Sequence, residues 1–400
     1  MSYAERKEQS PQGNVPNLRF PEFGGEWEKT MLSKVCLINP KTPELDDQFV
    51  YIDLESVEKG LLLCENIITK SEAPSRAQRV LNIGDILFQC VRPYQKNNLH
   101  FVCKQQDLQY VASTGYAQIR THLDSKYLYQ LLNTQKFIDQ VMLRCTGSSY
   151  PAINSTDLSS IPIHIAKETQ EQSKISAILT LLDQRITTQI KIIEDLKKLK
   201  SAISKRIFAQ KPICWNRLDT LFSKGKAGGT PTSTNKDYYN GDIPFLSIND
   251  ITKQGKYIRY TENHLSQSGL DNSSAWIVPA HSLIMSMYAS VGLVTINEVP
   301  ITTSQAMFAM QLKDKGLLDY LYYYLSYFKY RHIHKYLETG TQSNINADIV
   351  RCIMIPDYGH GRNIEIASTL RSIDTKIDNE LSVLEQLNKQ KNYLLAQMFI

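Results

Sequence analysis

Two long segments of the chain carry apolar residues at alternating spacings of four and three positions, the pattern of helices that pack along a narrow seam. The first segment, from about residue 168 to residue 210, contains no glycine or proline. Polar residues interrupt both seams at matching places, such as Gln189 in the first and Glu380 in the second, and such interruptions usually fix the register of a helix pair. The apolar seam positions are Leu182, Ile186, Ile193, Leu196 and Ile203, then Ile373, Ile377, Leu384, Leu387 and Leu394.

The two helical segments are copies of one another, and the copying extends upstream. Asp183 recurs as Asp374, 191 positions later, and the Tyr-Leu-Tyr run at residues 127–129 recurs at residues 320–322. Two copies of one module in one chain predict a pseudo-symmetric molecule. Such a molecule suits a pseudo-symmetric partner, and duplex DNA is the obvious candidate.

Shorter elements are expected between the helical segments. Residues 49–52, 86–88 and 243–246 have the composition of strands, residues 238–242 that of a tight turn, and residues 125–142 the apolar spacing of one helix. The matching stripes of the long helices are most simply buried against each other in an antiparallel pair, because the second helix then returns to the start of the first module. A parallel pair is possible but less economical.

We therefore expect an α+β chain in which a pair of long antiparallel coiled-coil helices separates two pseudo-symmetric mixed α/β modules. The polar N-terminal residues are expected to form a flexible tail. The predicted segments are the tail at 1–17, the first module at 18–167, the first helix at 168–211, the second module at 212–358 and the second helix at 359–400.

Composition and charge narrow the class of protein only slightly. Hydrophobic residues make up 42% and charged residues 21%, as in ordinary globular proteins, and the net charge of +5 is compatible with a polyanionic partner without proving one. The seven cysteines are odd in number and contain no C-x-x-C pair, which favours reduced thiols and argues against zinc. With no apolar run of membrane-spanning length and no signal peptide, we expect a cytoplasmic protein.

Motifs of catalysis are missing from the sequence. There is no G-x-x-x-x-G-K-[ST] phosphate loop and no Asn-Pro-Pro-aromatic run of the kind that amino-methyltransferases use for a flipped adenine. His332, His334 and His360 are better explained as surface histidines than as a metal site. We expect no catalytic residue, no metal site and no cofactor bound by this chain.

Polar loops supply candidates for contact with DNA, because Arg and Lys grip phosphates while Arg, Asn and Gln pair with base edges. In the first module, a polar loop after a strand contains Arg92, the best single candidate, and a second loop follows Gly147, whose backbone would allow close approach to a phosphate. A solvated hairpin tip and a plain connecting turn are the structural alternatives. The candidates are Gln89, Arg92, Tyr94, Lys96, Ser148, Ser149 and Tyr150.

The second module offers three candidate stretches. The glycine loop at 228–230 would present backbone N–H groups to phosphate or form a plain turn. The stretch at 247–250 would face a base edge or cap the next helical turn. The loop of small polar residues at 341–344 would contact DNA or remain a solvated loop. Tyrosines at 320–325 have the helical spacing of core packing, and the basic run at 197–200 is either a solvated face or a contact with DNA. The candidates are Gly228, Gly229, Thr230, Ser247, Asn249, Asp250, Thr341, Gln342, Ser343 and Asn344.

With these features together, the chain resembles the specificity subunit of a type I restriction–modification system. Leu18–Phe23 is similar to the opening of such subunits, and Gly228–Pro231 with Tyr239–Pro244 to the start of their target-recognition domains. Gly147–Asn154 and its looser counterpart Gly340–Asn346 resemble a loop near the end of that domain. The duplicated helices resemble the conserved spacer regions. The first module departs from the pattern, because Asn39–Pro43 stands where Gly-Gly-Thr-Pro is expected.

The resemblance implies a division of labour within a complex. Each target-recognition domain reads one half of a bipartite sequence in double-stranded DNA, and the helices fix the spacer. Two methyltransferase subunits, which bind S-adenosylmethionine, dock on the helices for adenine-N6 methylation. Two restriction (motor-nuclease) subunits, which use ATP and Mg²⁺, add cleavage of unmodified DNA. The chain itself is not the catalyst.

Two other functions fit the same sequence features. A stand-alone DNA-binding regulator with duplicated domains would bind its site without a methyltransferase. A coiled-coil scaffold would assemble proteins without touching DNA. Genes for a methyltransferase and a motor nuclease beside this one would favour the specificity subunit, and failure to bind any duplex would favour the scaffold.

Overall fold

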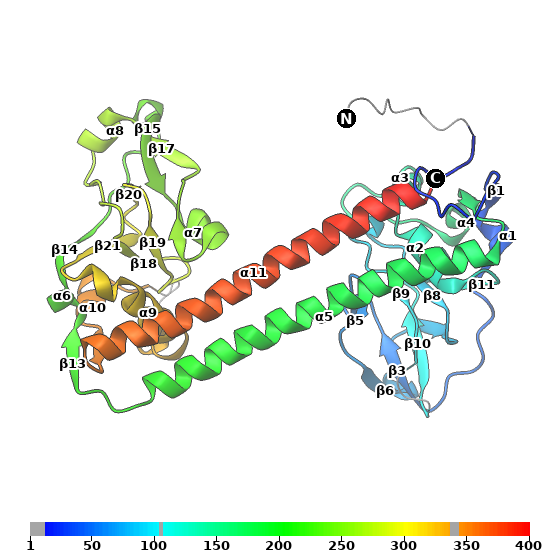
Figure 1. Ribbon diagram of the computed structural model, residues 1–400, viewed down its shortest axis with the longest axis horizontal. Coiled ribbons are helices and arrows are strands. Elements are labelled where there is room, and N and C mark those ends of the chain that lie inside the picture. The colour runs from blue at the N-terminus through cyan, green and yellow to red at the C-terminus, as the bar shows by residue number, and fades with distance from the viewer. Residues whose placement is uncertain (1–12, 104–106, 337–343) are drawn as a thin grey trace. The chain divides into compact units, whose positions relative to one another are not determined.

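The computed structural model describes residues 13–103, 107–336 and 344–400, and it divides into two compact units. The first unit combines the chain up to Lys191 with Ser382–Ile400, and the second extends from Ile192 to Leu381. Each unit therefore contains one globular module and about half of each long helix (Figure 1). Because the units divide both helices, each module is packed on helix segments that are far apart in the sequence.

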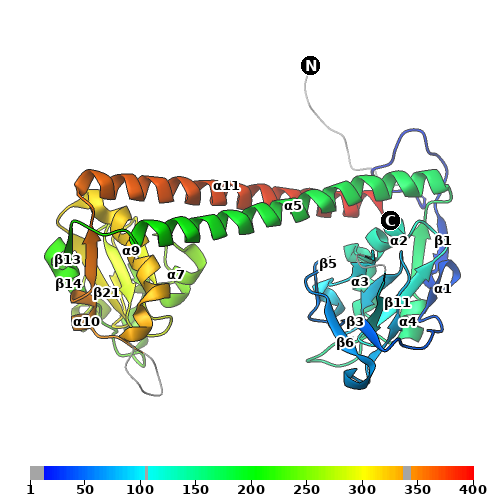
Figure 2. The same cartoon turned by 90° about the horizontal axis from the view of Figure 1, so that it is seen from below.

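The long helices are α5 (Thr169–Phe208) and α11 (His360–Met398). In each unit the two helices lie side by side and run in opposite directions (Figures 1 and 2). An ion pair of 2.5 Å joins Lys391 Nζ to Asp183 Oδ1 in the first unit, and another of 2.5 Å joins Lys200 Nζ to Asp374 Oδ1 in the second. The predicted antiparallel pairing is confirmed.

The seam positions of both helices face the interior of this pair and of the modules. Ile193, Ile377 and Leu387 are buried, and the remaining apolar seam residues are half-buried while their neighbours on either side are mostly exposed. Gln189, a polar seam residue, is also buried, at 7% exposure. Burial of a narrow stripe on an otherwise polar helix is the arrangement of a coiled coil.

The first module contains two four-stranded sheets, a two-stranded ribbon and a small hairpin. The ribbon pairs β1 (Glu28–Met31) with β12 (Pro162–Ile165). The first sheet has the order β6 (Asn66–Thr69), β3 (Gln48–Ile52), β10 (Gln109–Ser113), β7 (Ala77–Val80). The second has the order β2 (Cys36–Ile38), β11 (Tyr116–Thr121), β8 (Ile86–Gln89), β9 (Leu99–His100), and the hairpin joins β4 (Val57–Glu58) to β5 (Leu61–Leu62).

Short helices complete the first module. They are α1 (Leu32–Val35), α2 (Ser125–Leu132), α3 (Gln135–Met142), α4 (Ser155–Ser159) and the 3-10 helices η1 (Lys70–Glu72) and η2 (Pro93–Gln95). The single helix predicted for residues 125–142 is wrong, because α2 ends before Asn133 and α3 begins after Thr134. The Asn133 side chain donates to Tyr129 O at 2.7 Å, and Thr134 Oγ1 accepts from Phe137 N at 3.2 Å and thereby caps a new helix.

The second module has a related architecture. The ribbon pairs β13 (Cys214–Arg217) with β22 (Met354–Asp357). A five-stranded sheet has the order β14 (Phe222–Ala227), β21 (Met307–Leu312), β18 (Leu283–Ser286), β19 (Val294–Asn297), β16 (Tyr257–Ile258). A three-stranded sheet has the order β17 (Asn263–Leu265), β15 (Tyr239–Leu246), β20 (Thr302–Thr303).

The helices of the second module are α6 (Leu218–Leu221), α7 (Ile248–Gln254), α8 (Gln267–Asp271), α9 (Leu318–Arg331) and α10 (Ala347–Arg351), with η3 (Lys236–Tyr238), η4 (Lys315–Leu317) and η5 (Ile333–Lys335). The turn predicted at residues 238–242 is instead largely the irregular start of β15, whose pairing with β17 shifts register between Tyr239 and Ile243. Tyr320, Tyr323 and Tyr324 on α9 are buried, as expected for core packing.

Equivalent aromatic residues close the core of each unit. Phe399, just after α11, packs edge-to-face on Trp27 at 6.0 Å between ring centroids. Its counterpart Phe208, at the end of α5, packs on Tyr324 at 5.2 Å. Asn14 and Pro16, which were expected in the tail, contact the first module, because Pro16 is buried and the Trp27 N–H donates to Asn14 O at 2.8 Å. In the described ranges no helix combines the length and apolar character needed to cross a bilayer.

Candidate nucleic-acid interface

Two loops of the first module, residues 90–98 and 146–152, lie against each other. The first joins β8 to β9, and the Arg92 N–H donates to Pro151 O at 2.8 Å. The second is closed by two backbone hydrogen bonds of 2.9 Å between Thr146 and Ala152. Val91 also forms a β-bridge with Ala152, so the backbone fixes the position of one loop on the other.

Arg92 and Tyr150 meet where these loops touch. The guanidinium carbon of Arg92 lies 4.3 Å from the centroid of the Tyr150 ring, within the range of a cation–π contact. Tyr150 is 64% exposed and Arg92 is half-buried. Within the described structure the guanidinium has no hydrogen-bond acceptor and no carboxylate partner. Two residues expected to contact DNA therefore form one exposed cationic and aromatic surface.

The neighbouring candidates divide into exposed and buried residues. Tyr94, Ser148 and Ser149 are exposed on the same two loops. Gln89 is only 3% exposed, and its side chain donates to Gln95 Oε1 at 3.0 Å and accepts from the Asn97 N–H at 3.1 Å. Gln89 therefore shapes the loop from inside, and its contact with DNA stays a prediction that this burial does not favour.

Lys96 is also directed inward. Its Nζ donates to Asn133 O at 3.2 Å and to Gln135 Oε1 at 3.0 Å, tying the loop to the junction between α2 and α3. Burial lowers the pKa of Lys96. The ammonium group of Lys96 thus has internal acceptors, and its contact with DNA stays a prediction.

The glycine loop of the second module does not offer its amides to a ligand. Gly228 and Gly229 are buried, and their N–H groups donate to Met307 O and Thr303 O, both at 3.0 Å. A Cβ atom on Gly228 would lie 2.1 Å from Thr303 O, so close packing of backbone on backbone explains the glycine. Both amides are therefore occupied within the fold, and contact of this loop with phosphate stays a prediction. Thr230 is exposed, and its Oγ1 accepts from the Gln305 N–H at 3.4 Å.

Ser247 and Asp250 form a capping box at the start of α7. Ser247 Oγ accepts from the Asp250 N–H at 3.2 Å, and Asp250 Oδ2 accepts from the Ser247 N–H at 2.8 Å. Asp250 is 1% exposed. Asn249 is exposed and donates to Glu262 Oε2 at 2.9 Å. The alternative of helix capping therefore holds for this stretch.

The last candidate loop is described only in part. Thr341, Gln342 and Ser343 lie outside the described residues, and Asn344 is half-buried next to the buried Ile345. Ile345 N–H donates to Met287 O at 3.0 Å, as Ile153 N–H donates to Cys90 O at 3.0 Å in the first module. These matching bonds identify Met287 as the counterpart of Cys90.

That correspondence reveals a loop that sequence reasoning missed. The connection between β18 and β19 occupies the place of the loop at 90–98, and its residues Tyr288, Ala289 and Ser290 are exposed. Ala289 and Ser290 have left-handed backbones with φ of 36° and 49°, and Arg92 has φ of 54°. The sequence gives only a weak signal for this loop. The two loops correspond only when strand β8 is aligned with strand β18, at a shift of 197 positions.

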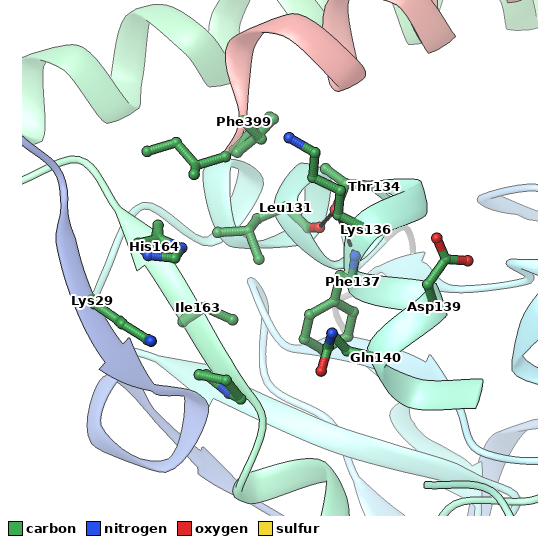
Figure 3. A pocket seen from close by; sticks show the side chains of 12 residues that line it. Lys29, Leu131, Thr134, Lys136, Phe137, Asp139, Gln140, Ile163, His164 and Phe399 are labelled. Atoms are coloured by element: carbon green, nitrogen blue, oxygen red, sulfur yellow. Dashed lines mark hydrogen bonds between the residues drawn. The ribbon is translucent and has the colours of Figure 1, made fainter. Parts of the chain in front are cut away.

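A pocket of about 400 Å³ lies in the first unit, near the C-terminal residues (Figure 3). Lys29 and His164 face it from the paired strands β1 and β12, and Lys136 and Asp139 from α3. Burial, then the charges of Lys29 and Lys136, lower the pKa of His164. Among the residues that line the pocket, the hydroxyl of Thr134 donates to Leu131 O and not to a base.

A smaller cavity of about 230 Å³ lies between α5 and α9 in the second unit, lined by Tyr323, Tyr327, Lys197 and Arg331 among others.

Two cysteines of the first module have unreactive thiols. Burial raises the pKa of the Cys36 thiol to about 12 and of the Cys90 thiol to about 11, which keeps both protonated at neutral pH. No set of three metal-ligating side chains is assembled in the part of the chain that the structure describes.

The repeated module, the antiparallel helices and the exposed polar loops define a class of DNA-specificity protein. The chain belongs to the family of the type I restriction modification DNA specificity domain, whose family model matches residues 25–198 and again residues 213–389. It is a type I specificity subunit with two recognition domains, and such subunits are non-catalytic and recognise DNA.

Named relatives agree with this assignment. The chain is 24% identical to the type I restriction enzyme HindI specificity subunit of Haemophilus influenzae over 378 residues, covering 74% of this chain and 81% of the relative. It is 28% identical over 178 residues to the MjaIX specificity subunit of Methanocaldococcus jannaschii, covering 43% and 40% of the two chains.

Solved structures share the fold. A chain from a structure on complex assembly and conformational transition of the type I R-M system superposes with a TM-score of 0.59 at 20% identity, covering 93% of this chain and 97% of that one. The S subunit of the type I system of M. genitalium gives a TM-score of 0.59 at 14% identity, covering 96% and 99%. The predicted fold class is confirmed.

Proposed function

We propose that each recognition domain reads one half of a bipartite sequence in double-stranded DNA and that the paired helices set the spacer between the halves. The observation that carries this proposal is the duplication of the whole unit, module and helix segments together. Specificity would then be additive over two half-sites, with each mismatched base pair costing about 1–3 kcal/mol.

The proposal includes partners that supply the chemistry. Two methyltransferase subunits with S-adenosylmethionine dock on the helices and methylate adenine at N6, and two motor-nuclease subunits with ATP and Mg²⁺ add cleavage. The complex acts on DNA in the cytoplasm. The absence of a catalytic arrangement among the described residues is compatible with this division of labour, because the specificity chain needs only to position the duplex.

Co-expression tests the proposal. The chain and its methyltransferase partner would be produced in a host without modification, and methylated bases would be mapped across the genome by long-read sequencing. We expect N6-methyladenine in a two-part motif with a fixed gap, absent without this chain. If the partner complex forms and no chain-dependent methylation is found, the regulator or the scaffold becomes the better explanation.

A further inference from the structure

The two modules differ at one structurally equivalent position on their exposed loops. Cys90 and Met287 accept matching backbone hydrogen bonds of 3.0 Å from Ile153 and Ile345. Two residues further along, the first module has Arg92 and the second has Ala289, both with a left-handed backbone. Residues 92 and 289 therefore occupy the same backbone position in the two modules. Of these two residues, only Arg92 has a side chain that can donate hydrogen bonds.

The surroundings of Arg92 restrict the position of its guanidinium. The backbone of residue 92 is fixed by its 2.8 Å hydrogen bond to Pro151 O, and the guanidinium carbon lies 4.3 Å from the centroid of the Tyr150 ring. The loop bearing Tyr150 is itself held in place by two backbone hydrogen bonds of 2.9 Å between Thr146 and Ala152, and it turns at Gly147, which has φ of 89°. A stacked guanidinium keeps its N–H groups at its edge, free for a partner in the same plane.

The composition of these loops favours a base over a phosphate as that partner. Residues 90–98 and 146–152 contain two cations, Arg92 and Lys96, and Lys96 is bonded inward. A phosphate grip gains from several cations in any orientation, whereas a single positioned arginine matches the O6 and N7 acceptors of guanine in the major groove. The exposed neighbours Tyr94, Ser148 and Ser149 are uncharged.

We propose that Arg92, oriented by Tyr150, reads a guanine in the half-site of the first module, and that the second module makes no equivalent contact at Ala289. This inference rests on the proposed function, since it assigns a specificity-determining residue to one recognition domain. It also predicts a specific asymmetry between the two halves of the target.

The methylation motif of variants tests the assignment. We expect Arg92→Gln to lower discrimination at one guanine of one half-site by about 5- to 150-fold, with the other half unchanged. Tyr150→Phe keeps the ring and should keep the guanine, whereas Tyr150→Leu should relax the same position. Arg76→Ala, at an exposed arginine of the same module, serves as the matched control and should leave the motif unchanged.

Binding of each variant to the methyltransferase partner would be checked first, so that only folded chains are compared. Equal loss of methylation at all sites, with no position relaxed, would mean that Arg92 contacts phosphate and would overturn the assignment. An unchanged motif in Arg92→Gln, or relaxation in both half-sites, would also overturn it. If the chain with its natural sequence produces no two-part methylation motif, the proposed function itself fails, and this result is distinct from the others.

Discussion

At the scale of single residues, one buried carboxylate explains why the opening segment contains Arg19 and Trp27. Glu171, in the first turn of α5, is fully buried and receives two hydrogen bonds from Arg19, of 2.7 and 2.8 Å. The indole N–H of Trp27 donates to the same carboxylate at 3.3 Å. The opening motif around Arg19 thus anchors the start of the chain on the first long helix, and hydrogen bonding to Glu171 raises the pKa of Arg19.

Replacing Glu171 with Gln should destabilise the first unit strongly, because it removes the buried carboxylate that pairs with the Arg19 guanidinium. The expected loss is about 3–5 kcal/mol in the free energy of unfolding, measured by urea denaturation. Glu28→Gln, at an exposed position of the same unit, is the control and should change stability little. Equal effects of the two substitutions would contradict the structural role assigned to Glu171.

Asp357 should make the start of α11 sensitive to acid. Burial raises its pKa, but hydrogen bonds from Gly359, Asn363 and Asn216 outweigh burial, and the net pKa is lowered. A lowered pKa in the folded state contributes stability above the unfolded pKa of about 3.9, and this stability is lost as the pH falls through the folded value.

The advantage of the natural chain over Asp357→Asn should therefore be present near neutral pH and shrink as the pH falls below about 4. Urea unfolding of both proteins across this range measures the difference. A stability difference that stays constant down to the lowest pH would show that the Asp357 charge has no part in it.

At the scale of elements, two polar interruptions of the seams, Lys200 and Lys391, pair with aspartates of the opposite helix, and the modules contact the same aspartates. Asp183 accepts a hydrogen bond of 2.7 Å from Gln130 on α2, and Asp374 accepts one of 2.8 Å from Tyr323 on α9. Each aspartate thus binds a lysine of the opposite helix and a polar residue of its own unit. We infer that these contacts align both long helices and the module.

Lys200→Ala should lower the stability of the second unit by about 1–3 kcal/mol, since it leaves Asp374 partly buried without its cation. Lys198→Ala is a matched control, because the side chain of Lys198 is 75% exposed. Thermal unfolding of single variants and of Lys200→Ala with Asp374→Asn would give the coupling energy. Purely additive effects would show that the pair does not align the helices.

The elements themselves were predictable wherever the periodicity was long. The bounds of α5 and α11 follow from their seams, and the strands at 49–52, 86–88 and 243–246 were found from their composition. The break between α2 and α3 was missed because apolar spacing continues across it, while Asn133 and Thr134 bond locally to backbone groups and end one helix and start another.

At the scale of the whole molecule, the length of the helices is the quantity that the proposed function uses. Inserting four helix-forming residues after Lys191 and again after Ser382, close to the boundary at which the two compact units divide the helices, would leave both ion pairs inside their own units. At about 1.5 Å per residue the insertion adds about 6 Å, or about two base pairs at 3.4 Å each.

The gap in the methylated motif should then lengthen by about two base pairs, and the two half-sites should stay the same. Long-read mapping of methylated bases measures both quantities at once. The same four residues inserted after Lys211, outside the helices, are the control and should leave the gap unchanged. A change in either half-site would contradict the separation of spacing from base reading.

The sequence by itself determined the duplication, the two long helices and the family, because each depends on a pattern repeated over many residues. It favoured an antiparallel pairing of the helices, which the structure decided. It also singled out Arg92 and Tyr150 by residue type. Only the tertiary structure decided which polar residues are free. Gln89, Lys96, Gly228, Gly229 and Asp250 have internal partners, while Arg92 meets Tyr150 across a sequence separation that no local pattern records. Hydrogen-bond satisfaction is settled by packing, and packing brings together residues that are distant in the chain.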